Sequence, residues 1–134
     1  MSTSMAAPIT ALYAGLFGLL IVALAALVVR QRVKCRVNLG IGDAAPLERA
    51  IRVHGNCVEY VPVALLLLLI AEINGGAAGM LHAYGATLLA ARVLHAIGLS
   101  RTDKPNACRF LGTVITWLVV VGLAAGGLLG YAKG

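Results

Sequence analysis

The chain has 134 residues, of which 60% are hydrophobic and 12% charged, and its mean hydropathy is +0.93. A water-soluble domain carries nearer a quarter charged residues, so this composition excludes an ordinary soluble enzyme. The net charge of +6 comes from basic residues that flank apolar runs without interleaved aromatic residues. This pattern argues against a nucleic-acid partner and favours anchoring at a membrane surface.

Four apolar runs, each long enough to cross a bilayer, follow one another along the chain. Pro46 is well placed to open the second run, and the uncharged turn at residues 74–76 makes the second and third runs an antiparallel hairpin. Spans of about 20 residues leave room only for short loops. The sequence therefore predicts one all-α domain, residues 1–134, folded as an up-down integral membrane four-helix bundle. The predicted spans cover about residues 8–29, 47–73, 77–99 and 109–131.

Charge placement predicts the orientation of these spans. Ten of the 11 basic residues lie in the first and third connections and the adjoining helix ends, whereas the second connection has none. Loops 36–46 and 100–108 are therefore expected to be cytoplasmic, with both chain ends on the opposite side. Small residues are expected to allow close contacts between helices, namely Gly15, Gly18, Gly85, Gly126 and Gly127.

The second span begins with the polar segment LERAIRVHGNCVEYVP, although charges inside a span are costly and usually functional. At about 100° per residue, five of its side chains share an arc of roughly 100°. This mixture of donors and one carboxylate suits a small anionic or zwitterionic ligand. The alternative is that Glu59 pairs with Arg49 or Arg52 and merely holds the bundle together. The stripe consists of Arg49, Arg52, Asn56, Glu59 and Tyr60, and His54 points away from it.

Other polar residues give weaker signals. The three cysteines lack metal-binding or disulfide spacing, and His54 has no second ligand on its helix, so no metal site is predicted. Most basic residues around the last loop, together with Arg92 and His95, fit interfacial anchors. Arg109 stands out because it starts the fourth span at the same membrane face as the polar stripe, the alternative being a snorkelling arginine.

The pattern of the second span resembles the signature of the MAPEG family, the membrane-associated proteins in eicosanoid and glutathione metabolism. The resemblance covers nearly the whole chain and points to a bacterial-type member similar to microsomal glutathione transferase. It implies a homotrimer in a bacterial inner membrane, with glutathione as co-substrate bound between subunits near the cytoplasmic face. The pattern is Glu48-Arg49-x-x-Arg52-x-His54-x-Asn56-x-x-Glu59-Tyr60-x-Pro62.

The resemblance also implies roles for individual residues. Arg32 resembles a basic residue that reaches glutathione from the neighbouring subunit, and His54 matches a polar position facing that neighbour. Arg109 is the best match to the catalytic arginine, although Arg101 is the alternative because the preceding loop needs a gap to align. His95 and Leu99 stand where some members carry tyrosines. The positions that match glutathione-binding residues are Arg52, Asn56, Glu59 and Tyr60, and Arg49 belongs to the same stripe.

The implied function is detoxification by a glutathione-dependent transferase or peroxidase acting on lipophilic electrophiles. Arg109 would stabilise the glutathione thiolate, since a free thiol has a pKa of about 8.5. The electrophile would arrive through the lipid and bind between the first and fourth spans, and nothing in the sequence specifies which electrophile it is. The alternative is a non-catalytic lipid-binding or scaffold protein of the same fold. A transporter fits poorly, because inverted repeats and discontinuous helices are missing.

Overall fold

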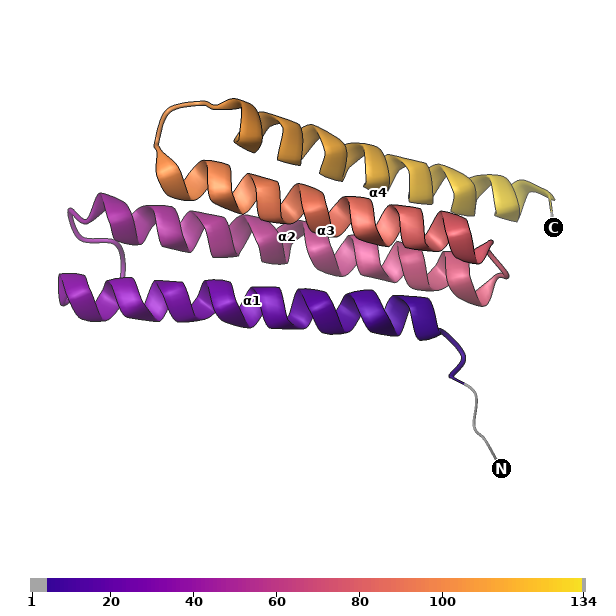
Figure 1. Cartoon of the computed structure of the whole chain (residues 1–134), viewed down its shortest axis with the longest axis horizontal. Coiled ribbons are helices and arrows are strands. Elements are labelled where there is room, and N and C mark those ends of the chain that lie inside the picture. The colour runs from indigo at the N-terminus through magenta and orange to yellow at the C-terminus, as the bar shows by residue number, and fades with distance from the viewer. Residues whose placement is uncertain (1–4, 134) are drawn as a thin grey trace.

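The computed structural model describes residues 5–133, which form four long helices (Figure 1). Each helix is long and apolar enough to cross a membrane. The all-α class and the four spans are therefore as predicted, while residues 1–4 and 134, which the predicted domain includes, lie outside the described residues. The helices are α1 (Pro8–Cys35), α2 (Ala45–Ile73), α3 (Ala78–Arg101) and α4 (Ala107–Lys133).

The first helix is longer than its apolar run. It continues from the predicted end at Val29 to Cys35, because arginine, glutamine and lysine are good helix formers and the helix can leave the bilayer. It ends at Arg36, whose backbone is left-handed at φ 56°. There the N–H of Val37 donates to the carbonyl of Arg32 at 3.1 Å, which satisfies a carbonyl of the last turn.

The helices alternate in direction, so the two longer loops lie at one end of the bundle (Figure 1). The start of α1, the end of α4 and the short α2–α3 turn lie at the other end. In that turn Gly75 has φ +80°, a conformation that side-chain-bearing residues rarely adopt. The up-down topology is as predicted, and the assignment of the loop end to the cytoplasm stays a prediction.

The α2–α3 hairpin forms the middle of the molecule. α1 packs against α2 and α3, and α4 packs against α3 and α2, whereas α1 and α4 make no contact with each other within the described residues. The expected substrate surface between the first and fourth spans is therefore not formed within one chain, because the hairpin separates the two helices (Figure 1). Such a surface would require α1 of one chain to contact α4 of another.

The core is a continuous apolar cluster supplied by all four helices. On α2 its members recur every three or four residues, so they form one face of the helix. Phe17 of α1 and Leu68 of α2 are almost completely buried. The core residues of α2 are Val53, Cys57, Val61, Ala64 and Leu68.

Glycines allow close contacts between helices in this structure, but most of these glycines are not the ones that the sequence predicted. A Cβ at Gly85 would overlap the ring of Tyr13, as expected for that position. A Cβ at Gly112 would lie 2.6 Å from the carbonyl oxygen of Ala91, which sets the close approach of α4 to α3. Within the single chain the prediction was wrong for four glycines at which an added Cβ would have nothing within 4 Å, namely Gly15, Gly18, Gly126 and Gly127.

At the end of the bundle opposite the two longer loops, a carboxylate that the sequence analysis did not single out connects two helices. Glu72, in the last turn of α2, accepts hydrogen bonds from the backbone N–H groups of Ile9 at 2.8 Å and Thr10 at 2.6 Å. These are free N–H groups of the first turn of α1, where the helix dipole favours a negative charge. The contact joins the beginning of α1 to the end of α2.

Candidate functional site

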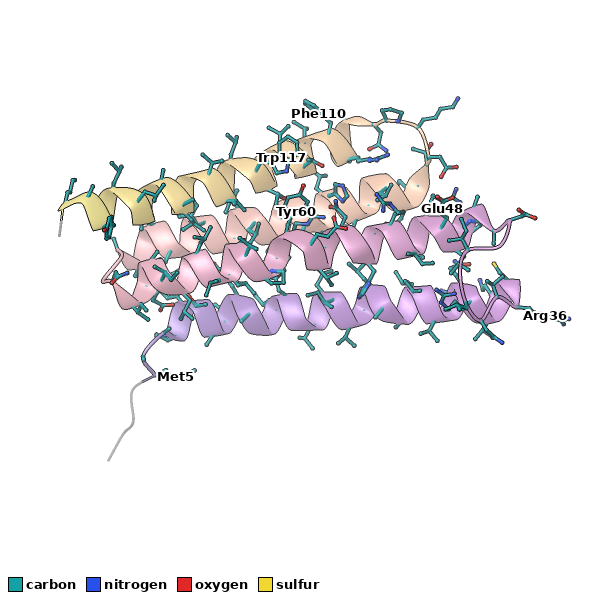
Figure 2. The ribbon with its side chains drawn as sticks, turned by 180° about the vertical axis from the view of Figure 1, so that it is seen from behind. Met5, Arg36, Glu48, Tyr60, Phe110 and Trp117 are labelled. Atoms are coloured by element: carbon teal, nitrogen blue, oxygen red, sulfur yellow. The ribbon has the colours of Figure 1, made fainter. Side chains whose placement is uncertain are left out.

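A polar cavity of about 280 Å³ opens at the loop end of the bundle. Its walls come from the first three turns of α2, the end of α3, the α3–α4 loop and the first turn of α4. Figure 2 shows Glu48 at this end of α2 and Tyr60 farther along the same helix. The lining residues are Glu48, Arg49, Arg52, Asn56, His95, Leu99, Asp103 and Arg109.

One of the three arginines in the cavity is neutralised. Arg49 donates to both carboxylate oxygens of Asp103, at 2.9 and 3.0 Å, which ties the α3–α4 loop to α2. Among residues 5–133, neither Arg52 nor Arg109 has a carboxylate oxygen within 4.0 Å. The cavity therefore keeps two cations available to an anionic ligand.

The alternative pairing of Glu59 with Arg49 or Arg52 is not formed. Ten residues of helix separate Arg49 from Glu59, about 15 Å along the axis, and seven separate Arg52 from Glu59, about 10 Å. Those distances are too long for direct pairing on one helix. Glu59 is exposed and lies outside the cavity lining.

A buried arginine lies directly behind the cavity wall. Arg92 of α3 is 2% exposed, and its guanidinium donates to the side-chain oxygen of Asn56. It also contacts Nδ1 of His95 at 3.2 Å and Oγ1 of Thr116 at 3.4 Å, and it lies 5.7 Å from the ring centre of Tyr60. Tyr60, a predicted glutathione contact, is thus placed beside Arg92 and not in the cavity lining.

The expectation that Arg92 is an interfacial anchor was wrong. Its side chain turns inward between α2 and α4 instead of reaching toward the membrane surface. The available signal was an arginine about two helical turns before the predicted end of its span, a position from which snorkelling is difficult.

Arg109 is held in place by the cap of α4. The side-chain oxygen of Asn106 accepts the backbone N–H of Arg109 at 2.9 Å, the usual geometry of a helix N-cap. The Asn106 amide donates to the carbonyl of Gly98 at 2.8 Å, so the cap is fixed to α3. A Cβ at Gly98 would lie 2.5 Å from the backbone nitrogen of Arg109, so this close approach requires glycine.

The remaining predicted site residues lie elsewhere in the single chain. Arg32 donates to carbonyls of the α1–α2 loop, the shortest contact being 3.0 Å to Gly40, and it does not line the cavity. His54 is half-buried and also outside the lining. Arg101, the alternative to Arg109, is exposed at the end of α3 and outside the lining as well.

A second cavity of about 250 Å³ lies on the other side of Arg49, between α1 and α2. Its walls are mainly apolar, including Leu24, Leu27 and Val53. Within residues 5–133, no group of three or more histidine, cysteine or acidic side chains is placed to hold a metal ion. The polar chemistry of this end of the molecule is therefore concentrated in the first cavity.

Four apolar spans with a cationic cavity at one end define a small multi-pass integral membrane protein with a polar site near the membrane surface. The chain belongs to the MAPEG family, whose model matches residues 10–129. It is 46% identical over 90 residues to the inner membrane protein YecN of Escherichia coli K12, an alignment that covers 67% of this chain and 69% of the relative. YecN of E. coli O6:H1 gives the same values.

Proposed function

We propose that the protein is a glutathione-dependent membrane transferase or peroxidase that acts on lipophilic electrophiles. The observation that carries the proposal is the cavity in which Arg52 and Arg109 face a ligand-sized space without carboxylate partners. Membership of the MAPEG family supports glutathione as the co-substrate. The electrophile would be a small apolar molecule that reaches the site through the lipid.

The donors in the cavity fit the charged groups of glutathione. Arg52 can bind a carboxylate through two parallel N–H groups, which is the strongest geometry for such a pair. The amide N–H₂ of Asn56 is free to donate, since its oxygen already accepts from Arg92. Glu48 is the unpaired carboxylate of the lining and is suited to the ligand ammonium group.

In the proposed reaction Arg109 favours the ionised form of the glutathione thiol. At neutral pH only a few per cent of a thiol with a pKa of about 8.5 is ionised. A guanidinium within hydrogen-bond reach that lowers this pKa by about two units makes the thiolate the major form. The sulfur then forms a bond to the electrophilic carbon, and the leaving group departs with its electron pair.

We also propose that the working unit is a homotrimer with the glutathione site at subunit contacts. Glu59 lies at the midpoint of α2 and is exposed in the single chain. A carboxylate facing lipid at that depth is costly, so a neighbouring subunit or water must cover it. Subunit contacts would also bring α1 of one chain to α4 of another and so supply the apolar surface for the electrophile.

An ultraviolet difference spectrum tests the proposed function, because a thiolate absorbs where a thiol does not. Purified protein with glutathione near neutral pH should show thiolate absorbance and should conjugate a generic hydrophobic electrophile. Arg109→Ala should lose most of both signals while glutathione affinity changes by less than about tenfold. Arg101→Ala is the matched control and should keep both signals.

Two results would redirect the proposal. Loss of the thiolate signal in Arg101→Ala but not in Arg109→Ala would assign the role to Arg101. Glutathione binding by the wild type without thiolate formation and without turnover of any electrophile would favour the scaffold alternative.

A further inference from the structure

Arg92 is a buried cation whose direct partners are all neutral. Among residues 5–133 no carboxylate oxygen lies within 4.0 Å of its guanidinium, and Nε has no hydrogen-bond partner at all. Its contacts are the side chains of Asn56, His95, Thr116 and Cys57 and the ring of Tyr60, and the carboxylate of Glu59 acts on it electrostatically from outside pairing distance. Burying a charge without a directly paired opposite charge is costly, and apolar residues usually stabilise such a position better. Bundle stability alone therefore does not account for an arginine here.

The arginine is connected directly to the cavity wall. Two of its partners, Asn56 on α2 and His95 on α3, line the cavity that also contains Arg52 and Arg109. Arg92 itself is not part of the lining. It therefore acts on the cavity through these two side chains.

A guanidinium has donors and no acceptor, and this determines how both partners are arranged. The Asn56 carboxamide turns its oxygen to Arg92, which leaves the N–H₂ group as the free hydrogen-bonding end of this cavity-lining side chain. His95 presents Nδ1 to Arg92 as an acceptor, so the neutral ring carries its hydrogen on Nε2. Both wall groups are then left with hydrogen-bond donors.

We propose that Arg92 is a positioning residue that makes this part of the cavity wall donor-only and thereby selective for anionic ligand atoms, a carboxylate or a thiolate. The inference rests on the proposed function for the identity of the ligand. The polarity of the wall can, however, be measured without glutathione.

Nitrogen NMR of histidine-labelled protein in lipid nanodiscs tests the arrangement. The chain has three histidines, so His54→Gln and His82→Gln assign the signal of His95. At mildly alkaline pH the wild type should show His95 with hydrogen on Nε2. Arg92→Met, which removes every donor, should convert a substantial fraction to the other tautomer, and Arg92→Lys should keep the wild-type form. Lys104→Met removes one charge from the exposed α3–α4 loop and should change nothing.

Glutathione binding supplies a second measurement on the same variants. Arg92→Met should weaken binding by about tenfold or more, because two charge-steered donors lose their orientation, and Arg92→Lys should restore most of it. A wild-type tautomer with hydrogen on Nδ1, or one that persists in folded Arg92→Met, would overturn the inference. If Arg92→Met does not fold, the wild-type tautomer and its retention in Arg92→Lys decide. If the wild type does not bind glutathione, the proposed function fails. The tautomer measurement still decides whether Arg92 determines which hydrogen-bond donors the cavity wall presents.

Discussion

The three arginines of the cavity differ in whether a carboxylate pairs with them. Arg49 is committed to Asp103, with its side chain 26% exposed and that of Asp103 68% exposed. An ion pair this exposed contributes little to stability, so its main effect is to position the α3–α4 loop. Arg52 and Arg109 have no such partner within the described residues and remain available to a ligand.

Replacement of Arg52 tests its availability. Arg52→Ala should weaken glutathione binding by roughly 1–3 kcal/mol, since it removes charge-assisted hydrogen bonds to a ligand carboxylate. Calorimetric titration in detergent measures this change. Arg101→Ala, which removes a cation outside the cavity lining, serves as the control and should bind like the wild type. Equal weakening by both variants would show that only the general positive charge of this face matters.

At the residue level, helical periodicity predicted which side chains of α2 lie on one face. The stripe on α2 correctly brought Arg49, Arg52 and Asn56 to one face, and all three line the cavity. Glu59 and Tyr60 belong to the same stripe but lie outside the lining. The reason is length: eleven residues from Arg49 to Tyr60 extend about 16 Å along a helix, farther than one small cavity reaches.

Arg92 could not be assigned from the sequence because its role depends on how three helices meet. The hydrophobic pattern does not fix which face of α3 turns toward α2 and α4. The partners of Arg92 come from two other helices, at Asn56 and Thr116. A buried position of this kind requires tertiary contacts, whereas the α2 stripe requires only one helix.

At the level of the helices, the start of α4 links stability to the site. Its N-cap, Asn106, contacts both Gly98 of α3 and the backbone of Arg109. The position of the catalytic candidate is thus controlled by one amide side chain and one close contact between helices.

Asn106→Ala should destabilise the protein by about 0.5–2 kcal/mol, the usual cost of losing an N-cap. The thiolate signal should fall as well, because the first turn of α4 no longer fixes Arg109. Asn106→Asp keeps an oxygen that accepts the Arg109 N–H but loses the N–H₂ group that donates to Gly98, so it should restore only part of the lost stability. Thermal unfolding followed by circular dichroism gives the stability of each variant. A thiolate signal unchanged in Asn106→Ala would show that the cap does not position Arg109.

The sequence predicted all four helices, but it predicted the residues at which they end less accurately. Apolar runs of sufficient length indicate the four spans, because the bilayer sets that length. The hydrophobic run does not mark the end of α1, since its last turns are basic and lie beyond the apolar segment. The glycines at true close contacts, such as Gly98 and Gly112, depend on helix rotation and so were not recognised.

For the whole molecule, the separation of α1 from α4 leaves large apolar surfaces open. Phe110 and Trp117 on α4, labelled in Figure 2, are 67% and 52% exposed. Exposed apolar side chains of this kind suit contact with lipid or with another subunit. Glu59 at the middle of α2 is exposed although it interacts electrostatically with Arg92 of the same chain, and its exposed side suits a subunit contact or a wet cavity.

Replacement of Glu59 therefore has opposite expected effects in a trimer and in a monomer. If Glu59 faces a neighbouring subunit, Glu59→Leu removes polar contacts across the interface, and native mass spectrometry from gentle detergents should show fewer trimers than the wild type. If Glu59 faces lipid in a monomer, the same change removes a charge from the lipid-facing surface and should raise thermal stability. Val63→Leu, at an exposed apolar position on the same helix, is the control and should leave the trimer fraction unchanged. Wild-type protein that is monomeric in every gentle detergent, combined with a stabilised Glu59→Leu variant, would rule out a site completed by a second subunit.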